Sequence, residues 1–183
     1  SNALRIKGLN PARSSYTDKK KAWWTDGRNN WAQVCATGLL CAERALEKKG
    51  DPLHPARAGA LATLKKCHKF YMPSGAYPEG PSYWHYGSNY HVLGLALLRS
   101  DSTKPSLPIP PEFKTSPLFI EHLTGPTGYV FNFADANPTR SRVTAAQSWM
   151  AREFNHPATC QYLRAKLKKD LSGNPSYKYG GSD

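Results

Sequence analysis

Apolar side chains recur at intervals of three and four residues along much of this chain, which is the pattern of helices with one buried face. The clearest segment begins at Trp31, and its apolar positions continue to Leu46. Asn29 or Asn30 can cap its start, and Lys48-Lys49-Gly50 has the chemistry of a helix end. We therefore expect a helix that begins at about Trp31 and ends close to residue 48.

Further helices are expected after this one, separated by long loops that are rich in proline and glycine. They are predicted from Pro55 to about Tyr71, about Ser82 to Arg99, near Ser116–Leu123, about Arg142–Phe154, and about Pro157–Leu171. Residues 129–133 alternate weakly between apolar and polar and predict a short strand. No alternation of strands and helices suggests a parallel sheet, so the pattern predicts an all-α fold of helical hairpins.

Four segments are expected along the chain. Residues 1–3 resemble the remnant of a cleaved expression tag. Residues 4–28 form a basic segment, read as a loop or short helix anchored by Trp23 and Trp24. Residues 29–171 form the helical domain, and residues 172–183 form a flexible tail with little to bury. Apolar runs stay far below the roughly 20 residues that span a bilayer, which excludes an integral membrane protein.

The composition shows that the chain is basic and has enough apolar residues to form a buried core. The chain has 183 residues, of which 39% are hydrophobic, and 25 Lys and Arg against 13 Asp and Glu give a net charge of +12. This charge favours a polyanionic partner. Nucleic acid is the weaker choice, because no recognition motif is present and the basic residues are spread along the chain.

Motifs for cofactors and metals are missing from the sequence. It contains no phosphate-binding loop and no dinucleotide-binding glycine motif, so we expect no nucleotide cofactor. The cysteines at 35, 41, 67 and 160 form no C-x-x-C pair, and we expect no metal. They are predicted to be small buried side chains, with disulfides left open if the protein is exported.

The first cluster of candidate chemistry surrounds the start of the strongest helix. Arg28, Asn29, Asn30 and Trp31 lie there, after a pair of tryptophans. Amide groups and free backbone N–H groups at a helix start attract an anionic oxygen. The alternative is a structural one, in which an asparagine caps the helix and the tryptophan belongs to the core.

A second cluster follows the Tyr77-Pro78-Glu79-Gly80-Pro81 loop. Tyr83, Tyr86 and Tyr90 are three and four residues apart, so they form one stripe on a helix. Buried phenols need hydrogen-bond partners, and aromatic faces also stack on sugar rings. The stripe is either a carbohydrate or anion site or a tyrosine-rich packing seam.

A third cluster runs from His122 to Asp135 and includes Thr124-Gly125-Pro126-Thr127-Gly128-Tyr129. Taken alone it reads as a turn, a strand and a turn with a structural role. In order and at a spacing of about 45 residues, however, the three clusters resemble the helical domain of the heparinase II/III-like polysaccharide lyase family, mostly bacterial and secreted or periplasmic. The resemblance covers about residues 20–170.

This resemblance implies an incomplete (α/α) toroid of helical hairpins with a substrate groove. It also implies a C-terminal β-sandwich domain, which this sequence does not supply, so we expect a partial toroid from a longer protein. The family cleaves uronic-acid-containing polysaccharides by β-elimination. By resemblance, Asn29 or Asn30 contacts the uronate carboxylate, and Tyr83 or Tyr86 is the acid or base, with Tyr83 preferred.

The remaining substrate-binding residues implied by the resemblance come from the same clusters. They are Arg28, Trp31, Glu79, Trp84, His85 and Tyr90. Trp31 stands where active members often carry histidine, and a tryptophan cannot exchange a proton. The isolated chain is therefore expected to be inactive, and the alternative function is a non-catalytic domain that binds acidic glycans.

Overall fold

The computed structural model describes residues 2–18, 22–47, 54–100 and 106–172, and within these ranges the fold is all-α, as predicted. The α-helices are α1 (Asn10–Thr17), α2 (Asn30–Leu46), α3 (Ala56–Cys67), α4 (Gly80–Arg99), α5 (Ser116–Leu123), α6 (Ala145–Glu153) and α7 (Pro157–Ser172). Shorter helical turns are η1 (Leu4–Leu9), η2 (Trp23–Asp26), η3 (His68–Tyr71) and η4 (Pro111–Lys114). No helix of the described ranges is long and apolar enough to cross a bilayer.

Helices α2, α3 and α4 form the centre of the fold, with α2 packed against both of the others. Helix α2 buries Ala32, Ala36, Leu39 and Leu40, which are spaced to share one face. Its predicted start is confirmed to within one residue, whereas the predicted end at 48–50 lies outside the described residues. Burying this face against two neighbours positions the loop before α4 beside the start of α2.

The N-terminal segment is more ordered than the sequence suggested. Of the two expectations, a loop or a short helix, the helix is found: η1 and α1 are helical from Leu4 to Thr17, and Leu9 is 1% exposed in the main core. The ring of Tyr16 lies directly over Gly59, where any side chain would clash with it. This glycine therefore lets α1 approach α3 closely.

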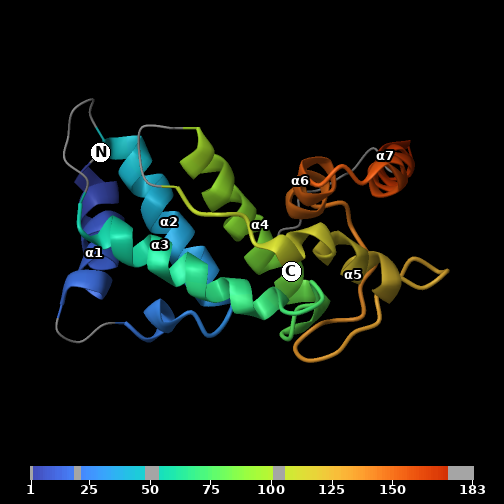
Figure 1. Ribbon diagram of the computed structural model, residues 1–183, viewed down its shortest axis with the longest axis horizontal. Coiled ribbons are helices and arrows are strands. Elements are labelled where there is room, and N and C mark those ends of the chain that lie inside the picture. Colours follow the sequence, from blue (N-terminus) through green and yellow to red (C-terminus); the bar gives the residue numbers. More distant parts are fainter. Residues whose placement is uncertain (1, 19–21, 48–53, 101–105, 173–183) are drawn as a thin grey trace.

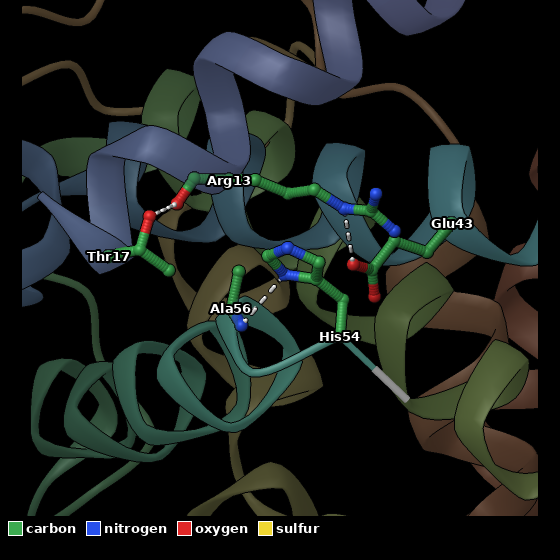
Figure 2. Close-up of polar contacts among 5 residues, drawn as sticks. All are labelled: Arg13, Thr17, Glu43, His54 and Ala56. Atoms are coloured by element: carbon green, nitrogen blue, oxygen red, sulfur yellow. Dashed lines mark hydrogen bonds and ion pairs between the residues drawn. The ribbon is translucent and has the colours of Figure 1, made fainter. Parts of the chain in front are cut away.

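An ion pair connects α1 to α2. Arg13 Nε donates to Glu43 Oε1 at 3.2 Å, with the Glu43 side chain 7% exposed (Figure 2). Next to it in Figure 2, His54 Nδ1 accepts a hydrogen bond from the Ala56 backbone N–H at the start of α3. The Arg13–Glu43 pair makes the basic N-terminal segment part of the same packed structure as the helices that follow.

The second half of the chain continues the fold away from the N-terminal helices. Figure 1 shows α1, α2 and α3 towards one end of the molecule, α4 in the middle, and α6 and α7 towards the other end. Helix α6 packs on α4 and α5, and α7 packs mainly on α6. The predicted helices in this half are confirmed, with the bounds of α5 as expected.

The segment predicted as a strand at 129–133 forms isolated bridges rather than a strand. Tyr129 bridges Arg140, and Val130 bridges Thr124. Tyr129 and Phe131 are both largely exposed, and Val130 is the one buried side chain of residues 129–133, which leaves little apolar surface to stabilise a longer ladder. The prediction of a strand was therefore wrong, although the segment does join two loops that are distant in sequence.

The cysteines are free in the described residues, with Cys67 buried and the other three partly buried. Burial raises the pKa of the Cys67 thiol to about 12, which is the behaviour of a structural cysteine. The flexible tail was predicted at residues 172–183. Ser172 is the last residue of α7, and residues 173–183 lie outside the described residues.

Candidate functional site

The start of α2 is capped by a carboxylate from the loop before α4. Glu79 Oε2 accepts from the Asn30 backbone N–H at 2.7 Å, and Glu79 Oε1 accepts from Asn30 Nδ2 at 3.1 Å. Asn29 occupies the capping position, but its side chain makes no capping bond, which corrects the expectation that an asparagine side chain caps this helix. A carboxylate suits this place because the helix dipole favours negative charge there.

A buried polar network continues from this cap into the core. Tyr77 Oη donates to Gln33 Oε1 at 2.7 Å and also lies 3.3 Å from Glu79 Oε2. Gln33 Nε2 donates to Tyr71 Oη at 2.8 Å and lies 3.1 Å from His91 Nδ1. The network is fully enclosed at Gln33, which is 0% exposed, so its members hold α2, α4 and the intervening loop in one arrangement.

Two histidines at the inner end of this network remain neutral. Burial lowers the pKa of His91 to about 3, with a smaller contribution from His68, whose ring centroid is 5.3 Å away. Burial also lowers the pKa of His68 to about 4. A neutral His91 can accept from Gln33 through Nδ1, so the network needs no charge on these rings.

The three tyrosines predicted to form a stripe on α4 differ in exposure. Tyr86 is 47% exposed, whereas Tyr83 and Tyr90 are partly buried, with Tyr83 packed against the core. The rings of Tyr86 and Tyr90 meet edge to face with centroids 5.3 Å apart. Partial burial, followed by the influence of Tyr90, raises the pKa of Tyr86 above the usual value for tyrosine.

Trp31 projects into solvent from the first turn of α2. Its side chain is 54% exposed, so the alternative of a core tryptophan is wrong. Trp23, which is 61% exposed, lies edge to face against it at a centroid distance of 6.3 Å. Arg28 is also exposed and pairs with Asp26 at 3.4 Å.

Exposed or partly buried rings lie on both α2 and α4, which pack against each other. We call Trp23, Trp31, Tyr86 and Tyr90 the aromatic face. The first cluster contributes the ring pair of Trp23 and Trp31, and the second contributes the ring pair of Tyr86 and Tyr90.

Two other candidate residues point elsewhere. Trp84 is fully buried, and its Nε1 donates to Ser116 Oγ at 2.7 Å, so its ring packs in the core. His85 lines a cavity together with Arg140 and Arg142. Burial lowers the pKa of His85 to about 4, and Lys166 and Arg142 lower it further. These two positions are therefore separate from the aromatic face.

Sequence reasoning missed the most connected residue of the region. Gln33 is a polar side chain inside the apolar pattern of α2, and that position was the available signal for a buried hydrogen-bond network. No three His, Cys, Asp or Glu side chains of the described ranges gather as a metal site. A scan against protein-family models and a search of curated proteins find no match to this chain.

Proposed function

We propose that this chain binds an acidic, uronic-acid-containing polysaccharide through the aromatic face, as the partial toroid domain of a secreted or periplasmic lyase-like protein. The observation that carries the proposal is the exposure of Trp31 and Tyr86 on adjacent helices, beside Trp23 and Tyr90. A stable fold gains nothing from leaving two tryptophans in water, and clustered exposed rings are typical of a binding surface.

Sugar rings suit this surface chemically. The C–H groups of a pyranose pack on the flat face of an indole or phenol, while Trp N–H and Tyr O–H groups remain free to bond hydroxyls. Rings from two helices provide more than one such contact along a chain of sugars. The exposed Arg28 guanidinium and the net charge of +12 attract the carboxylates of a uronate polymer.

β-Elimination is the catalytic form of this proposal and is favoured by the exposed Tyr86 phenol. In that reaction a base removes the C5 proton, the C4–C5 double bond forms, and the C4–O bond breaks as an acid protonates the leaving oxygen. The Tyr86 phenol carries its proton at neutral pH, so it has a proton to give to the leaving oxygen. Asn30 is not available to the uronate carboxylate, because it is 3% exposed and its side chain donates to Glu79, which leaves the partly buried Asn29 as the candidate for that contact.

Binding is tested by titrating the chain with oligogalacturonate and with a neutral oligosaccharide of the same length, following tryptophan fluorescence. We expect saturable quenching with the uronate, and a loss of at least about tenfold in affinity for Trp31→Ala, since stacking on one ring contributes about 1–3 kcal/mol by analogy with base stacking. Phe131→Ala is the matched control, because Phe131 is 68% exposed and lies outside the aromatic face. Equal affinity for all three proteins would contradict the proposal.

Elimination is tested separately on the full-length protein by the ultraviolet absorbance of the unsaturated product. Tyr86→Phe and Tyr83→Phe each remove one hydroxyl, and loss of a proton-transfer group lowers the rate by about 10²–10⁴-fold. We expect that loss at one of the two positions, with uronate binding retained. Binding without turnover by the unsubstituted protein would favour the non-catalytic alternative.

A further inference from the structure

Four basic side chains gather around two adjoining cavities at the end of the molecule that carries α7. The larger cavity, of about 400 Å³, is lined by Arg140, Lys166 and Lys169. The smaller one, of about 250 Å³, is lined by Arg140, Arg142 and His85. Arg140 lines both, so the two cavities are neighbours, and we call them together the basic cleft.

Within the described residues, no ion pair neutralises the positive charges of the basic cleft. In the described parts of the chain, none of Arg140, Arg142, Lys166 and Lys169 has a carboxylate oxygen within 4 Å. Asp170 is the acidic residue that lines the larger cavity. The cleft therefore presents an excess of positive charge in a concave surface, where charge acts more strongly than on an open one.

The basic groups act on one another across the cleft. Burial lowers the pKa of Lys166, and the charges of Arg140 and Lys169 lower it further, against the opposing effect of Asp170. Lys166 also lowers the pKa of His85, after the larger effect of burial. A bound anion would relieve this repulsion, because it places negative charge among groups that now repel one another.

The Arg140 guanidinium is held in position before any ligand binds. It lies over the Tyr129 ring, with its central carbon 5.1 Å from the ring centroid. The backbone bridge between Tyr129 and Arg140, and the hydrogen bond of 2.9 Å from the Ser141 N–H to the Gly128 carbonyl, fix the strand-like segment that carries it. A fixed arginine loses less conformational entropy on binding an anion than a free one.

We propose that the basic cleft binds a tetrahedral oxyanion carried by a small molecule as a sulfate or phosphate monoester. A tetrahedral group has three terminal oxygens that can meet one guanidinium and two ammonium groups, whereas a carboxylate has two. The larger cavity, of about 400 Å³, is within the range of small-molecule sites. The turn at Thr124–Gly128, part of the third sequence cluster, forms its other wall.

This site is distinct from the aromatic face and does not depend on the polysaccharide proposal. Its basic residues come from α7 and from the loop at 139–142, and although His85 on α4 lines the smaller cavity, no ring of the aromatic face lines either cavity. The two proposals can therefore fail separately. Trp31→Ala should weaken uronate binding and leave ester binding unchanged.

The test is a titration of the ¹⁵N-labelled chain with glucose 6-sulfate, glucose 6-phosphate and glucose, observed by NMR. We expect saturable shifts at the Gly125, Gly128 and Ser141 amides with at least one ester and none with glucose. Lys169→Gln and Arg140→Gln should each weaken ester binding by about tenfold or more, since each removes a charge-assisted hydrogen bond. Preference for one ester identifies the natural source of the oxyanion.

The matched control is Lys168→Gln, which removes the same charge from an exposed residue of α7 that lines neither cavity. It should change the dissociation constant by less than about twofold. Absence of saturable shifts with both esters would overturn the proposal. So would an equal loss of affinity in Lys168→Gln and Lys169→Gln, because that would indicate diffuse attraction by net charge.

Discussion

Removing the Tyr77 hydroxyl isolates one hydrogen bond of the buried network at the start of α2. In Tyr77→Phe the ring remains, so packing against Phe70 and Tyr71 is retained. What is lost is the bond of 2.7 Å to Gln33 Oε1 and the weaker contact of 3.3 Å to Glu79 Oε2. Gln33 Oε1 is then left without a donor in a site that is closed to solvent.

The expected magnitude follows from this burial. An acceptor that loses its partner inside a protein costs about 1–3 kcal/mol, because it gave up water on folding and now gains nothing in return. For a chain of this size, each kcal/mol lowers the melting temperature by about 2–4 °C. Tyr77→Phe should therefore melt roughly 2–12 °C below the unsubstituted protein and should unfold at lower urea with an unchanged slope.

Tyr83→Phe is the matched control, since it makes the same chemical change six residues later. Tyr83 packs against the core but makes no hydrogen bond within the described residues. Loss of the Tyr83 hydroxyl should change the free energy of unfolding by less than about 0.5 kcal/mol, the usual range for a substitution that breaks no buried hydrogen bond. Equal unfolding midpoints for the two variants would refute the reasoning that the network stabilises this region.

Three further predictions concern stability and are checked by urea unfolding followed by circular dichroism. Arg13→Ala leaves the buried Glu43 carboxylate unpaired and should lower the free energy of unfolding by about 1–3 kcal/mol. Arg28→Ala removes an exposed ion pair and should change that free energy little. Similar effects of the two substitutions would show that the burial of Glu43 is unimportant. Gly38→Ala should stabilise α2 by about 0.5–1 kcal/mol, because an added methyl group meets nothing within 4 Å there, and a loss of stability would contradict this. Burial lowers the pKa of His91 to about 3 in the folded state, whereas in the unfolded chain this histidine has its ordinary pKa near 6.5. The unfolded chain therefore binds more protons as the pH falls below about 6.5, and His91 should remove about 2 kcal/mol of the free energy of unfolding between about pH 7.5 and pH 5. A free energy of unfolding that stays constant over this range would disprove the neutrality of His91.

The helices could be predicted because their apolar periodicity is local. Residues three and four apart on α2, α4 and α5 record which face is buried, and proline marks several starts. The N-terminal helix was less evident, since polar residues interrupt its apolar pattern and Leu9 is its one buried position, with Ala12 and Tyr16 only partly buried against the core. Its stability depends on tertiary contacts such as Arg13 with Glu43, which are 30 residues apart.

The candidate site was predicted in part for the same reason. The sequence brought forward Trp31, Tyr86 and Tyr90, but it could not tell exposed rings from buried ones, and Trp84 lies in the core. The cap that Glu79 gives to α2 connects residues 49 apart, and no local pattern records it. The basic cleft was missed because its members come from segments that only the fold brings together.

The most direct test of the central claim is a calorimetric titration of the chain with a uronate oligosaccharide, with Trp31→Ala and Phe131→Ala measured under the same salt conditions. If the aromatic face binds the sugar, the unsubstituted chain and Phe131→Ala give the same saturable binding, and Trp31→Ala weakens it by about tenfold or more. If Trp31→Ala binds as well as the unsubstituted chain, the aromatic face is not the binding surface and the polysaccharide proposal is wrong.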